Sequence, residues 1–372
     1  MTRPAPPAAR IDVVLVGTRG QVGTALRQRL AVQQPQIARQ AGVDLRLLAT
    51  FDRRGFAFDL AGLAPANAEA SMRPRRDADI DALFAHLAKP DAAPAIVVDC
   101  TASDDIASRY PEWLGGGLGV VTANKRANAR SLAFYWTLQR LADEGGVPYR
   151  YETTVGAAIP LLGPLRDLRL RGERVRRIEG VMSGSLGFLL QQLHAGVRFS
   201  DALAEARRLG YTESDPGDDL RADDLARKLV VLAREAGFAL ESADIDVQPF
   251  SAHAKAEPLH WAKRLDREDR EWQERISWAQ GEGLRWVMLA EVDAGGARIG
   301  LRALPPGSPF AALAAGQNLV RVETELQAER PLLLGGPGAG PDVTAAGVLS
   351  DLIGAAEKLS RCGASARARI AA

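Results

Sequence analysis

The chain has 372 residues, of which 47% are hydrophobic and 25% are charged, as is ordinary for a folded globular protein. Its formal net charge is only +1, so the composition gives no reason to expect a nucleic acid or a membrane surface as a partner. Two widely separated cysteines exclude a disulfide framework, and without a signal peptide or a run of about 18 apolar residues we expect a soluble, cytoplasmic protein.

The first part of the chain alternates strand-like and helix-like segments. The strand-like runs lie at 11–16, 45–51, 95–100, 119–127 and 147–156. Such alternation is typical of a parallel sheet built from βα units. We therefore expect a flexible tail at 1–10 and a dinucleotide-binding α/β domain at 11–150.

Beyond Gly156 the pattern becomes that of a mixed α+β unit. It predicts helices at 200–209 and from about 223 to 236, and antiparallel strands at 298–304 and 316–325. The last segment returns to a glycine turn followed by a helix. The predicted fold is a Rossmann-type parallel sheet with an inserted α+β domain at 151–333 and a C-terminal return to the nucleotide domain at 334–372.

Glycines mark the junction between the first strand and the first helix, in VVLVGTRGQVGTAL. Such glycines permit a tight turn and let a pyrophosphate approach the helix N-terminus closely. The spacing is G-x-x-G-x-x-G, not the strict G-x-G-x-x-G, because Arg19 intervenes. Its place after the first strand favours a phosphate loop over a purely structural turn. The residues expected to contact a dinucleotide here are Gly17, Gly20, Gln21, Val22 and Gly23.

The second predicted strand ends in Asp52, Arg53 and Arg54. An acid at this place accepts hydrogen bonds from the adenosine ribose of NAD, whereas an arginine favours the 2′-phosphate of NADP. The sequence offers both, and plain surface charge would also explain the arginines. The choice between NAD and NADP therefore stays open, with Asp52 and Arg53 as the candidate residues.

The segment GYTESDPGDDLRADDLARK, at 210–228, concentrates acids in front of one lysine. Asp224 and Lys228 are four residues apart on a predicted helix, so they share one face. A surface ion pair would explain them. The apolar stripe of Leu225, Leu229 and Leu232 beside them instead indicates partial burial.

The same segment resembles the homoserine dehydrogenase signature G-Y-x-E-x-D-P-x-x-D-x-x-x-x-D-x-A-x-K. Other blocks follow in that family's order: VVDCTAS, VVTANKRA, YETTVGAAIP, VMSGSLGFLL and GPGAGPDVTAAGV. The resemblance extends from Ile11 to about Lys358 and is weakest over 61–94 and 253–304. It implies an oxidoreductase acting on a CH–OH group, which reversibly reduces L-aspartate 4-semialdehyde to L-homoserine with NAD(P)H, in threonine, methionine and isoleucine biosynthesis.

The resemblance also implies roles for single residues. Lys228 matches the catalytic lysine, and Lys125 a second lysine between nicotinamide and substrate. Glu213, Asp219 and Asp224 match acids at the substrate, whose α-ammonium a carboxylate cluster can hold. Hydride addition leaves negative charge on the aldehyde oxygen, to which Lys228 would give a proton, so the oxidising direction should run faster at alkaline pH. Further cofactor contacts are expected at Thr101, Lys125, Gly210 and Gly340.

YETTVGAAIP resembles the family's monovalent-cation loop. Glu152 and the carbonyls of Val155, Ala157 and Ile159 would bind Na⁺ or K⁺ in a structural role, although Ala158 stands where many members have glycine. The resemblance further implies a homodimer formed through the second domain. Because little sequence precedes the first strand or follows the last helix, we expect a monofunctional enzyme without an aspartokinase or a C-terminal regulatory domain, and weak inhibition by threonine.

Other readings stay open at this point. An aspartate-semialdehyde dehydrogenase would need Cys100 as its nucleophile, yet no histidine lies near it in the sequence, and a small buried strand residue explains it more simply. Another NAD(P)-dependent amino-acid carbonyl reductase, or a sensor that binds NAD(P) without turnover, would also carry the phosphate loop.

Overall fold

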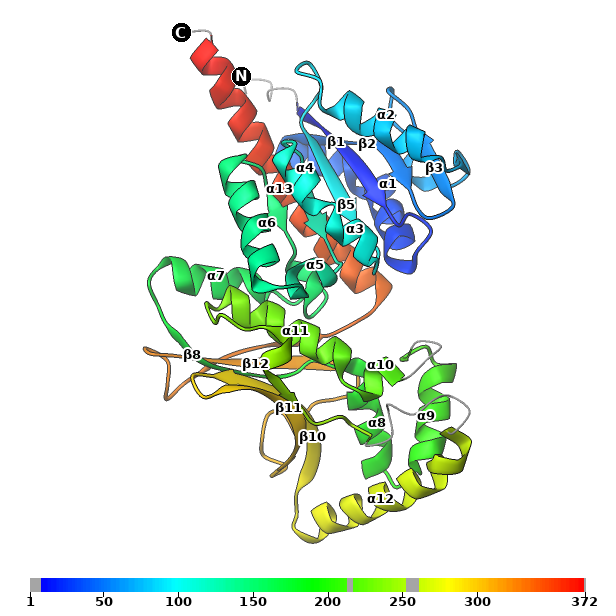
Figure 1. Cartoon of the computed structure of the whole chain (residues 1–372), viewed down its shortest axis with the longest axis vertical. Coiled ribbons are helices and arrows are strands. Elements are labelled where there is room, and N and C mark those ends of the chain that lie inside the picture. Colours follow the sequence, from blue (N-terminus) through cyan, green and yellow to red (C-terminus); the bar gives the residue numbers. More distant parts are fainter. Residues whose placement is uncertain (1–7, 213–216, 252–260, 371–372) are drawn as a thin grey trace. The chain divides into compact units, whose positions relative to one another are not determined.

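The computed structural model describes residues 8–212, 217–251 and 261–370 (Figure 1). The chain divides into two compact units, Met1–Ala158 with Gly340–Ala372, and Ile159–Ala339. Within the described ranges, no helix is long and apolar enough to cross a bilayer.

A seven-stranded sheet forms the first unit, in the order β4-β3-β2-β1-β5-β6-β7. Strands β2, β1, β5, β6 and β7 run parallel, while β3 and β4 extend the β2 edge in antiparallel fashion. The predicted Rossmann-type parallel sheet is confirmed. The strands are β1 (Ala9–Val16), β2 (Val43–Phe51), β3 (Gly55–Phe58), β4 (Arg73–Pro74), β5 (Ala95–Asp99), β6 (Gly119–Thr122) and β7 (Tyr149–Arg150).

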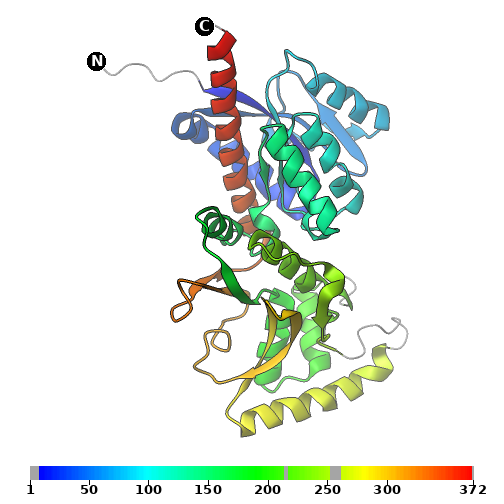
Figure 2. The ribbon, with the colours of Figure 1, turned by 60° about the vertical axis from the view of Figure 1, so that its left-hand side comes forward.

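Two helices far apart in sequence, α1 and α13, pack together against strands of this sheet (Figure 2). Leu26 and Leu30 of α1 and Val348 and Leu352 of α13 share one apolar core with Leu15 of β1. The helical segments of the unit are α1 (Gln21–Ala41), η1 (Pro65–Asn67), α2 (Asp77–Leu87), α3 (Asp104–Ser108), α4 (Tyr110–Gly115), α5 (Arg126–Ala129), α6 (Leu132–Glu144), η2 (Glu152–Thr154) and α13 (Pro341–Ile370).

The borders of the units differ from those predicted. Strand β1 begins at Ala9, within the range predicted as a tail, and residues 1–7 of that range lie outside the described residues. Residues 151–158 belong to the first unit, where η2 contacts α13, and not to the inserted domain at 151–333. The C-terminal return begins at Gly340, not at 334, because β13 (Leu332–Pro337) pairs with β12 (Gln317–Thr324) in the second unit.

A six-stranded sheet forms the second unit, in the order β13-β12-β8-β10-β11-β9. All neighbours are antiparallel except β11 and β9, which confirms the predicted α+β character. Strand β10, which no motif predicted, pairs with both β8 and β11. The remaining elements are α7 (Leu162–Leu170), β8 (Val175–Val181), α8 (Gly184–His194), α9 (Phe199–Arg208), α10 (Gly217–Leu220), α11 (Asp223–Glu235), η3 (Ser242–Asp244), β9 (Ile245–Val247), α12 (Trp261–Gly281), β10 (Arg285–Asp293) and β11 (Gly296–Leu304).

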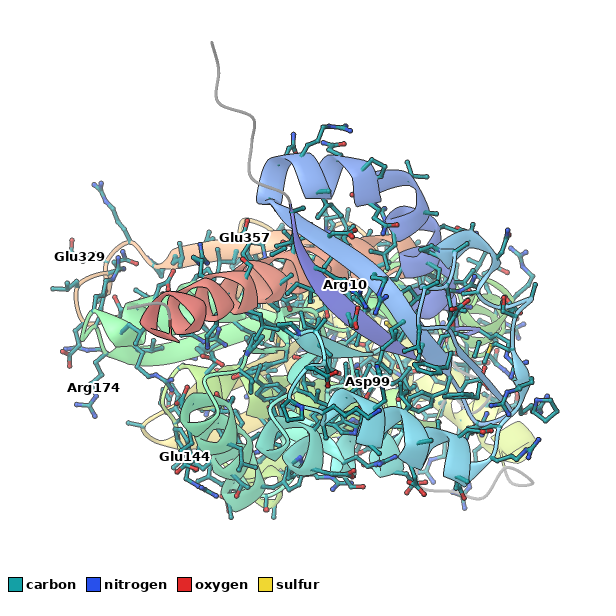
Figure 3. All side chains as sticks on the ribbon, turned by 90° about the horizontal axis from the view of Figure 1, so that it is seen from above. Arg10, Asp99, Glu144, Arg174, Glu329 and Glu357 are labelled. Carbon is teal, nitrogen blue, oxygen red and sulfur yellow. The ribbon has the colours of Figure 1, made fainter. Side chains whose placement is uncertain are left out.

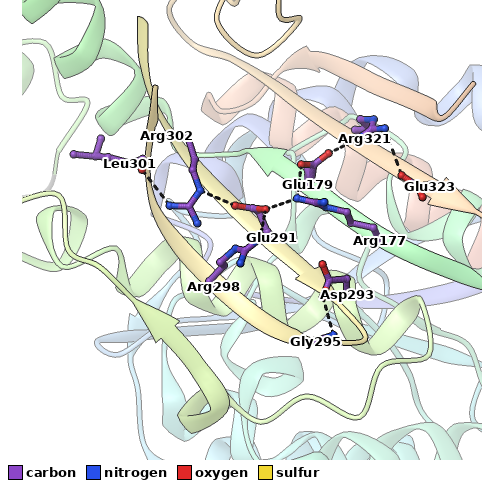
Figure 4. Close-up of polar contacts among 10 residues, drawn as sticks. All are labelled: Arg177, Glu179, Glu291, Asp293, Gly295, Arg298, Leu301, Arg302, Arg321 and Glu323. Atoms are coloured by element: carbon purple, nitrogen blue, oxygen red, sulfur yellow. Dashed lines mark hydrogen bonds and ion pairs between the residues drawn. The ribbon is translucent and has the colours of Figure 1, made fainter. Parts of the chain in front are cut away.

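The two faces of this second sheet differ in polarity. Because side chains alternate along a strand, the buried residues Ile178, Val292, Ile299 and Val320 share one face. The opposite face carries a row of charges across the strands (Figure 4). Its centre is Glu291, whose carboxylate oxygens lie 2.5 Å from a nitrogen of Arg177 and 3.1 Å from nitrogens of Arg298 and Arg302. Arg177 and Arg321 pair in turn with Glu179.

Candidate functional site

Lys228 lies on α11 and is held by two oxygen atoms. Its Nζ donates to the carbonyl oxygen of Met182 at 2.8 Å and lies 2.8 Å from Oδ2 of Asp224. The side chains of Lys228 and Asp224 are 12% and 31% exposed, so the pair is partly buried, as the apolar stripe indicates. The helix keeps this orientation because the adjacent apolar stripe, including the buried Leu225 and Leu229, packs in the core.

The oxygen that accepts from Lys228 belongs to the junction between β8 and α8. Met182 follows the strand, and Ser183 caps the helix by accepting a backbone N–H at 3.3 Å. Ser185 donates from Oγ to Oδ1 of Asp219 at 2.8 Å and lies 3.1 Å from the hydroxyl of Ser183. This junction therefore positions both the lysine and the Asp219 carboxylate.

A strained turn separates α10 from α11. Ala222 has a φ of 64°, a left-handed conformation that costs an L-residue roughly 1–2 kcal/mol. Its N–H donates to the carbonyl oxygen of Asp219 at 2.9 Å, and its own carbonyl accepts the first helical bond, from Ala226, at 2.9 Å. Such strain is concentrated at functional sites. Here it lies between the turn of Asp219 and the helix that carries Asp224 and Lys228.

The structure thus brings together, within the second unit, three of the residues predicted to act on substrate: Asp219, Asp224 and Lys228. Of the other two, Glu213 lies outside the described residues and Lys125 belongs to the first unit. Asp218 forms an ion pair with Arg221.

The glycine loop of the first unit leaves no room for a side chain at Gly17 or Gly23. Gly17 has a φ of 86°, and a Cβ there would stand 2.8 Å from Cγ2 of Thr101. A Cβ on Gly23 would stand 2.2 Å from the carbonyl oxygen of Gly17, which also accepts the N–H of Gly20 at 3.0 Å. Gln21 then opens α1. Because the backbone is bare at the N-terminus of a 21-residue helix, the loop fits a dinucleotide pyrophosphate.

A buried carboxylate fixes the two loops that follow β5 and β6. Asp99, labelled in Figure 3, is fully buried and accepts from the backbone N–H of Thr101 at 2.7 Å, the hydroxyl of Tyr110 at 2.6 Å and Nδ2 of Asn124 at 3.0 Å. Burial raises the pKa of Asp99 even though these hydrogen bonds act to lower it. Thr101 thereby lies against the glycine loop, and the half-buried Lys125 directly follows Asn124.

The other predicted cofactor residues lie at element borders. Asp52 follows the last strand residue of β2 and is bound by Arg19, whereas Arg53 is exposed. Gly340 precedes α13, with a φ of 123°. Gly210 has a φ of 74° just after α9, and this left-handed position at a helix C-terminus is by itself a reason for glycine.

Both units match known family models. Residues 160–353 match the homoserine dehydrogenase model, and residues 19–152 match that of the homoserine dehydrogenase NAD-binding domain. A homoserine dehydrogenase of Paracoccidioides brasiliensis is 34% identical over 293 residues, which cover 75% of this chain and 78% of that one. The chain belongs to the homoserine dehydrogenase family.

Two further relatives, which differ in length, support the same family assignment. A bifunctional aspartokinase/homoserine dehydrogenase of Zea mays is 34% identical over 341 residues, which are 90% of this chain but 37% of the maize protein. The chain therefore spans little more than a third of that relative. A hyperthermophilic archaeal homoserine dehydrogenase, solved in complex with NADPH, has a TM-score of 0.71 and 26% identity, and covers 93% of this chain and 97% of its own.

The thiol of Cys100 does not have the surroundings of a reactive nucleophile. Cys100 packs partly buried against the core of the first unit. Burial, together with the nearby Asp99, raises the pKa of the thiol far above its ordinary value, so the thiolate needed for nucleophilic attack does not form at neutral pH. This agrees with the interpretation of Cys100 as a small structural residue.

The predicted cation loop of this chain has an unusual backbone. Gly156 and Ala157 both adopt left-handed conformations, with φ of 76° and 55°, so the strained alanine is Ala157 and not Ala158. Helix α13 approaches this loop closely, since a Cβ on Gly347 would stand 2.4 Å from Cγ2 of Thr153. The loop is thus shaped by packing against α13.

Several residues of the site were not predicted. The Met182 carbonyl and Ser185 lie in the block VMSGSLGFLL. This block supported the family resemblance but indicated no role for either residue. Asp99 lies in the block VVDCTAS, which likewise indicated no role for it, and Tyr110 lies in none of the quoted blocks. The contact between Arg19 and Asp52 joins residues 33 positions apart, and only the order of β1 and β2 in the sheet brings them together.

Proposed function

We propose that this chain catalyses the reversible NAD(P)H-dependent reduction of L-aspartate 4-semialdehyde to L-homoserine. The observation that carries the proposal is Lys228, held between the Asp224 carboxylate and the Met182 carbonyl in the acid-rich segment. A general acid must stand in a defined position with its proton directed at the reacting oxygen. Two fixed oxygen partners give Lys228 such a position.

In this proposal each set of residues has one task. Asp219 and Asp224, with Glu213, hold the α-ammonium of the substrate by charge-assisted hydrogen bonds and so orient its aldehyde. Lys228 delivers a proton from Nζ to the oxygen that gains negative charge, and takes it back in the oxidising direction. Lys125 adds a second positive charge for that oxygen. A bound nicotinamide cofactor would supply or accept the hydride.

The dinucleotide is proposed to lie on the first unit. Gly17, Gly20 and Gly23 would let its pyrophosphate approach the backbone, with Gln21 and Val22 at the helix start. Thr101, packed on Gly17, would close the other side of the loop. Gly340, at the start of α13, is retained as a proposed contact, as is Gly210.

The test is to mix purified protein with aspartate semialdehyde and either NADPH or NADH and to follow the loss of near-ultraviolet absorbance. We expect oxidation of at least one cofactor, with homoserine as the product by chromatography against a standard. Cofactor binding without turnover would contradict the proposal and leave a NAD(P)-binding sensor. Turnover only of other amino-acid carbonyl compounds would also refute it.

Three further proposals follow from the family resemblance. A homodimer through the second unit is tested by sedimentation velocity, where a monomer at micromolar concentration would refute it.

A structural Na⁺ or K⁺ bound by Glu152 and the carbonyls of Val155, Ala157 and Ile159 suits the hard oxygen donors present. An unfolding midpoint equal in choline, sodium and potassium buffers would argue against this cation site.

A cytoplasmic location agrees with the free Cys100 thiol and is tested by fractionation.

A further inference from the structure

Arg19 is the residue that lengthens the glycine loop beyond the strict fingerprint, and its side chain reaches the end of β2. Its Nε lies 2.5 Å from Oδ2 of Asp52, and its Nη2 lies 2.6 Å from Oδ1. The two parallel contacts form the bidentate fork that makes arginine–carboxylate pairs specific in geometry. The glycine loop and the acid at the end of β2 are therefore joined directly.

This contact changes what Asp52 can bind. Its Oδ1 also accepts the backbone N–H groups of Arg54 at 2.8 Å and of Gly55 at 2.9 Å. A carboxylate offers about four lone-pair positions, two on each oxygen. Oδ1 accepts three N–H groups and is saturated, whereas Oδ2 accepts only the Arg19 Nε–H. Burial alone would raise the pKa of Asp52, but the hydrogen bonds from Arg19, Arg54 and Gly55 hold the pKa below its usual range. Asp52 is thus charged and keeps one open acceptor position on Oδ2, too few to accept both ribose hydroxyls.

The surroundings of Asp52 carry an excess of positive charge. Arg19 neutralises the carboxylate, and its guanidinium keeps N–H donors beyond those that Asp52 uses. Arg53 and Arg54 are exposed at the same turn. Arg75 donates from Nη1 to the carbonyl oxygen of Asp52 at 3.3 Å. A doubly charged phosphate would be attracted to this group of arginines, whereas a neutral hydroxyl would gain little from it.

We propose that Arg19 makes this chain select a dinucleotide with a 2′-phosphate, by occupying an acceptor position on each oxygen of Asp52 and donating to the phosphate itself. The inference rests on the proposed function only in that the first unit binds NAD(P). It concerns the adenosine end of the cofactor, away from the reacting nicotinamide. The competing explanation is that Arg19 only braces the loop, in which case its loss would weaken binding of every adenine nucleotide alike.

The test compares two probes that differ only in the 2′-phosphate, 2′,5′-ADP and 5′-AMP, by isothermal titration calorimetry on the full chain. We expect the native protein to bind 2′,5′-ADP at least about tenfold more tightly, since a charged hydrogen bond contributes roughly 1.5–3 kcal/mol. Arg19→Gln should weaken 2′,5′-ADP by about tenfold or more and leave 5′-AMP unchanged or tighter. Arg39→Gln, which removes an exposed arginine from the last turn of α1, is the matched control and should change neither.

Asp52→Asn separates the two parts of the proposal. It frees Arg19 from its ion pair, so 2′,5′-ADP should bind as tightly as before or more tightly. Equal weakening of both probes by Arg19→Gln, an unchanged affinity for 2′,5′-ADP, or a native preference for 5′-AMP would each overturn the inference. Circular dichroism checks that each variant is folded. Because no turnover is measured, selectivity without homoserine formation would refute the proposed function alone.

Discussion

At the scale of single residues, Gly23 shows why the phosphate loop has its composition. It lies in the first turn of α1, where glycine normally weakens a helix by about 1 kcal/mol relative to alanine. The missing side chain is nevertheless required, since a Cβ would stand 2.2 Å from the Gly17 carbonyl oxygen and 3.1 Å from Cα of Thr18. Close contact between helix and loop therefore outweighs helix propensity at this position.

This contrast predicts opposite results for two helical glycines. Gly23→Ala should lower the free energy of unfolding by roughly 1–3 kcal/mol, because the loop must move away from the helix. Gly187→Ala in α8, where a Cβ meets no atom within 4 Å, should raise it by up to about 1 kcal/mol. Urea unfolding of both variants measures the difference. Equal stabilisation by the two substitutions would show that the loop is not closely packed on α1.

At the scale of elements, the second sheet concentrates charge on one face, with Glu291 of β10 at its centre. The Glu291 side chain is only 4% exposed, but the arginines around it are between 33% and 51% exposed. Burial alone would raise the pKa of Glu291, yet Arg298 and Arg177 hold it below its ordinary value. The charged glutamate is therefore stabilised by folding, and this stabilisation depends on pH.

A group whose pKa falls on folding contributes stability above its unfolded pKa and loses it as the pH drops through the folded value. Glu291→Gln should accordingly lower the free energy of unfolding by roughly 1–3 kcal/mol at neutral pH, a range reduced for the solvent around the arginines. The deficit should shrink as the pH falls below about 4. Glu144→Gln, which removes an exposed pair with Arg140, is the control and should change little. A deficit for Glu291→Gln that stays constant from neutral to acid pH would contradict this account.

The elements that could be predicted are those encoded locally. The glycine turn between β1 and α1 and the amphipathic α11 follow from spacing within about 20 residues, and both lie where they were expected. Strand β10 could not be predicted, because its pairing with β8 depends on residues more than 100 positions earlier, as in the pair of Glu291 with Glu179. Its apolar content alone does not distinguish a strand from a buried helix.

The site follows the same rule. The acids and Lys228 were predicted because the signature holds them in one short segment. The partner of Lys228, the Met182 carbonyl, lies 46 positions away. It is a backbone atom, so the residue type at this position does not indicate its role. Asp99 with Tyr110 and Asn124, like Arg19 with Asp52, comes together only through the order of the strands. A sequence shows such residues but not their proximity.

At the scale of the whole molecule, most features proposed for cofactor and for substrate belong to different units of the chain, with Lys125 and Gly210 as the exceptions. The glycine loop, Thr101 and Asp52 lie in the first unit, whereas Asp219, Asp224 and Lys228 lie in the second. The account therefore predicts that loss of Lys228 removes turnover and leaves dinucleotide binding intact. A residue needed only for folding would lower both.

The most direct measurement is kcat for aspartate semialdehyde reduction by Lys228→Ala, with Lys89→Ala, an exposed lysine beyond α2, as the control. Loss of a general acid predicts a fall in kcat of about 10²–10⁴-fold for Lys228→Ala. NADPH affinity by calorimetry should be unchanged, and Lys89→Ala should match the native enzyme. A Lys228→Ala enzyme that keeps kcat within about threefold of native would show that the proton comes from elsewhere, and would contradict the central claim.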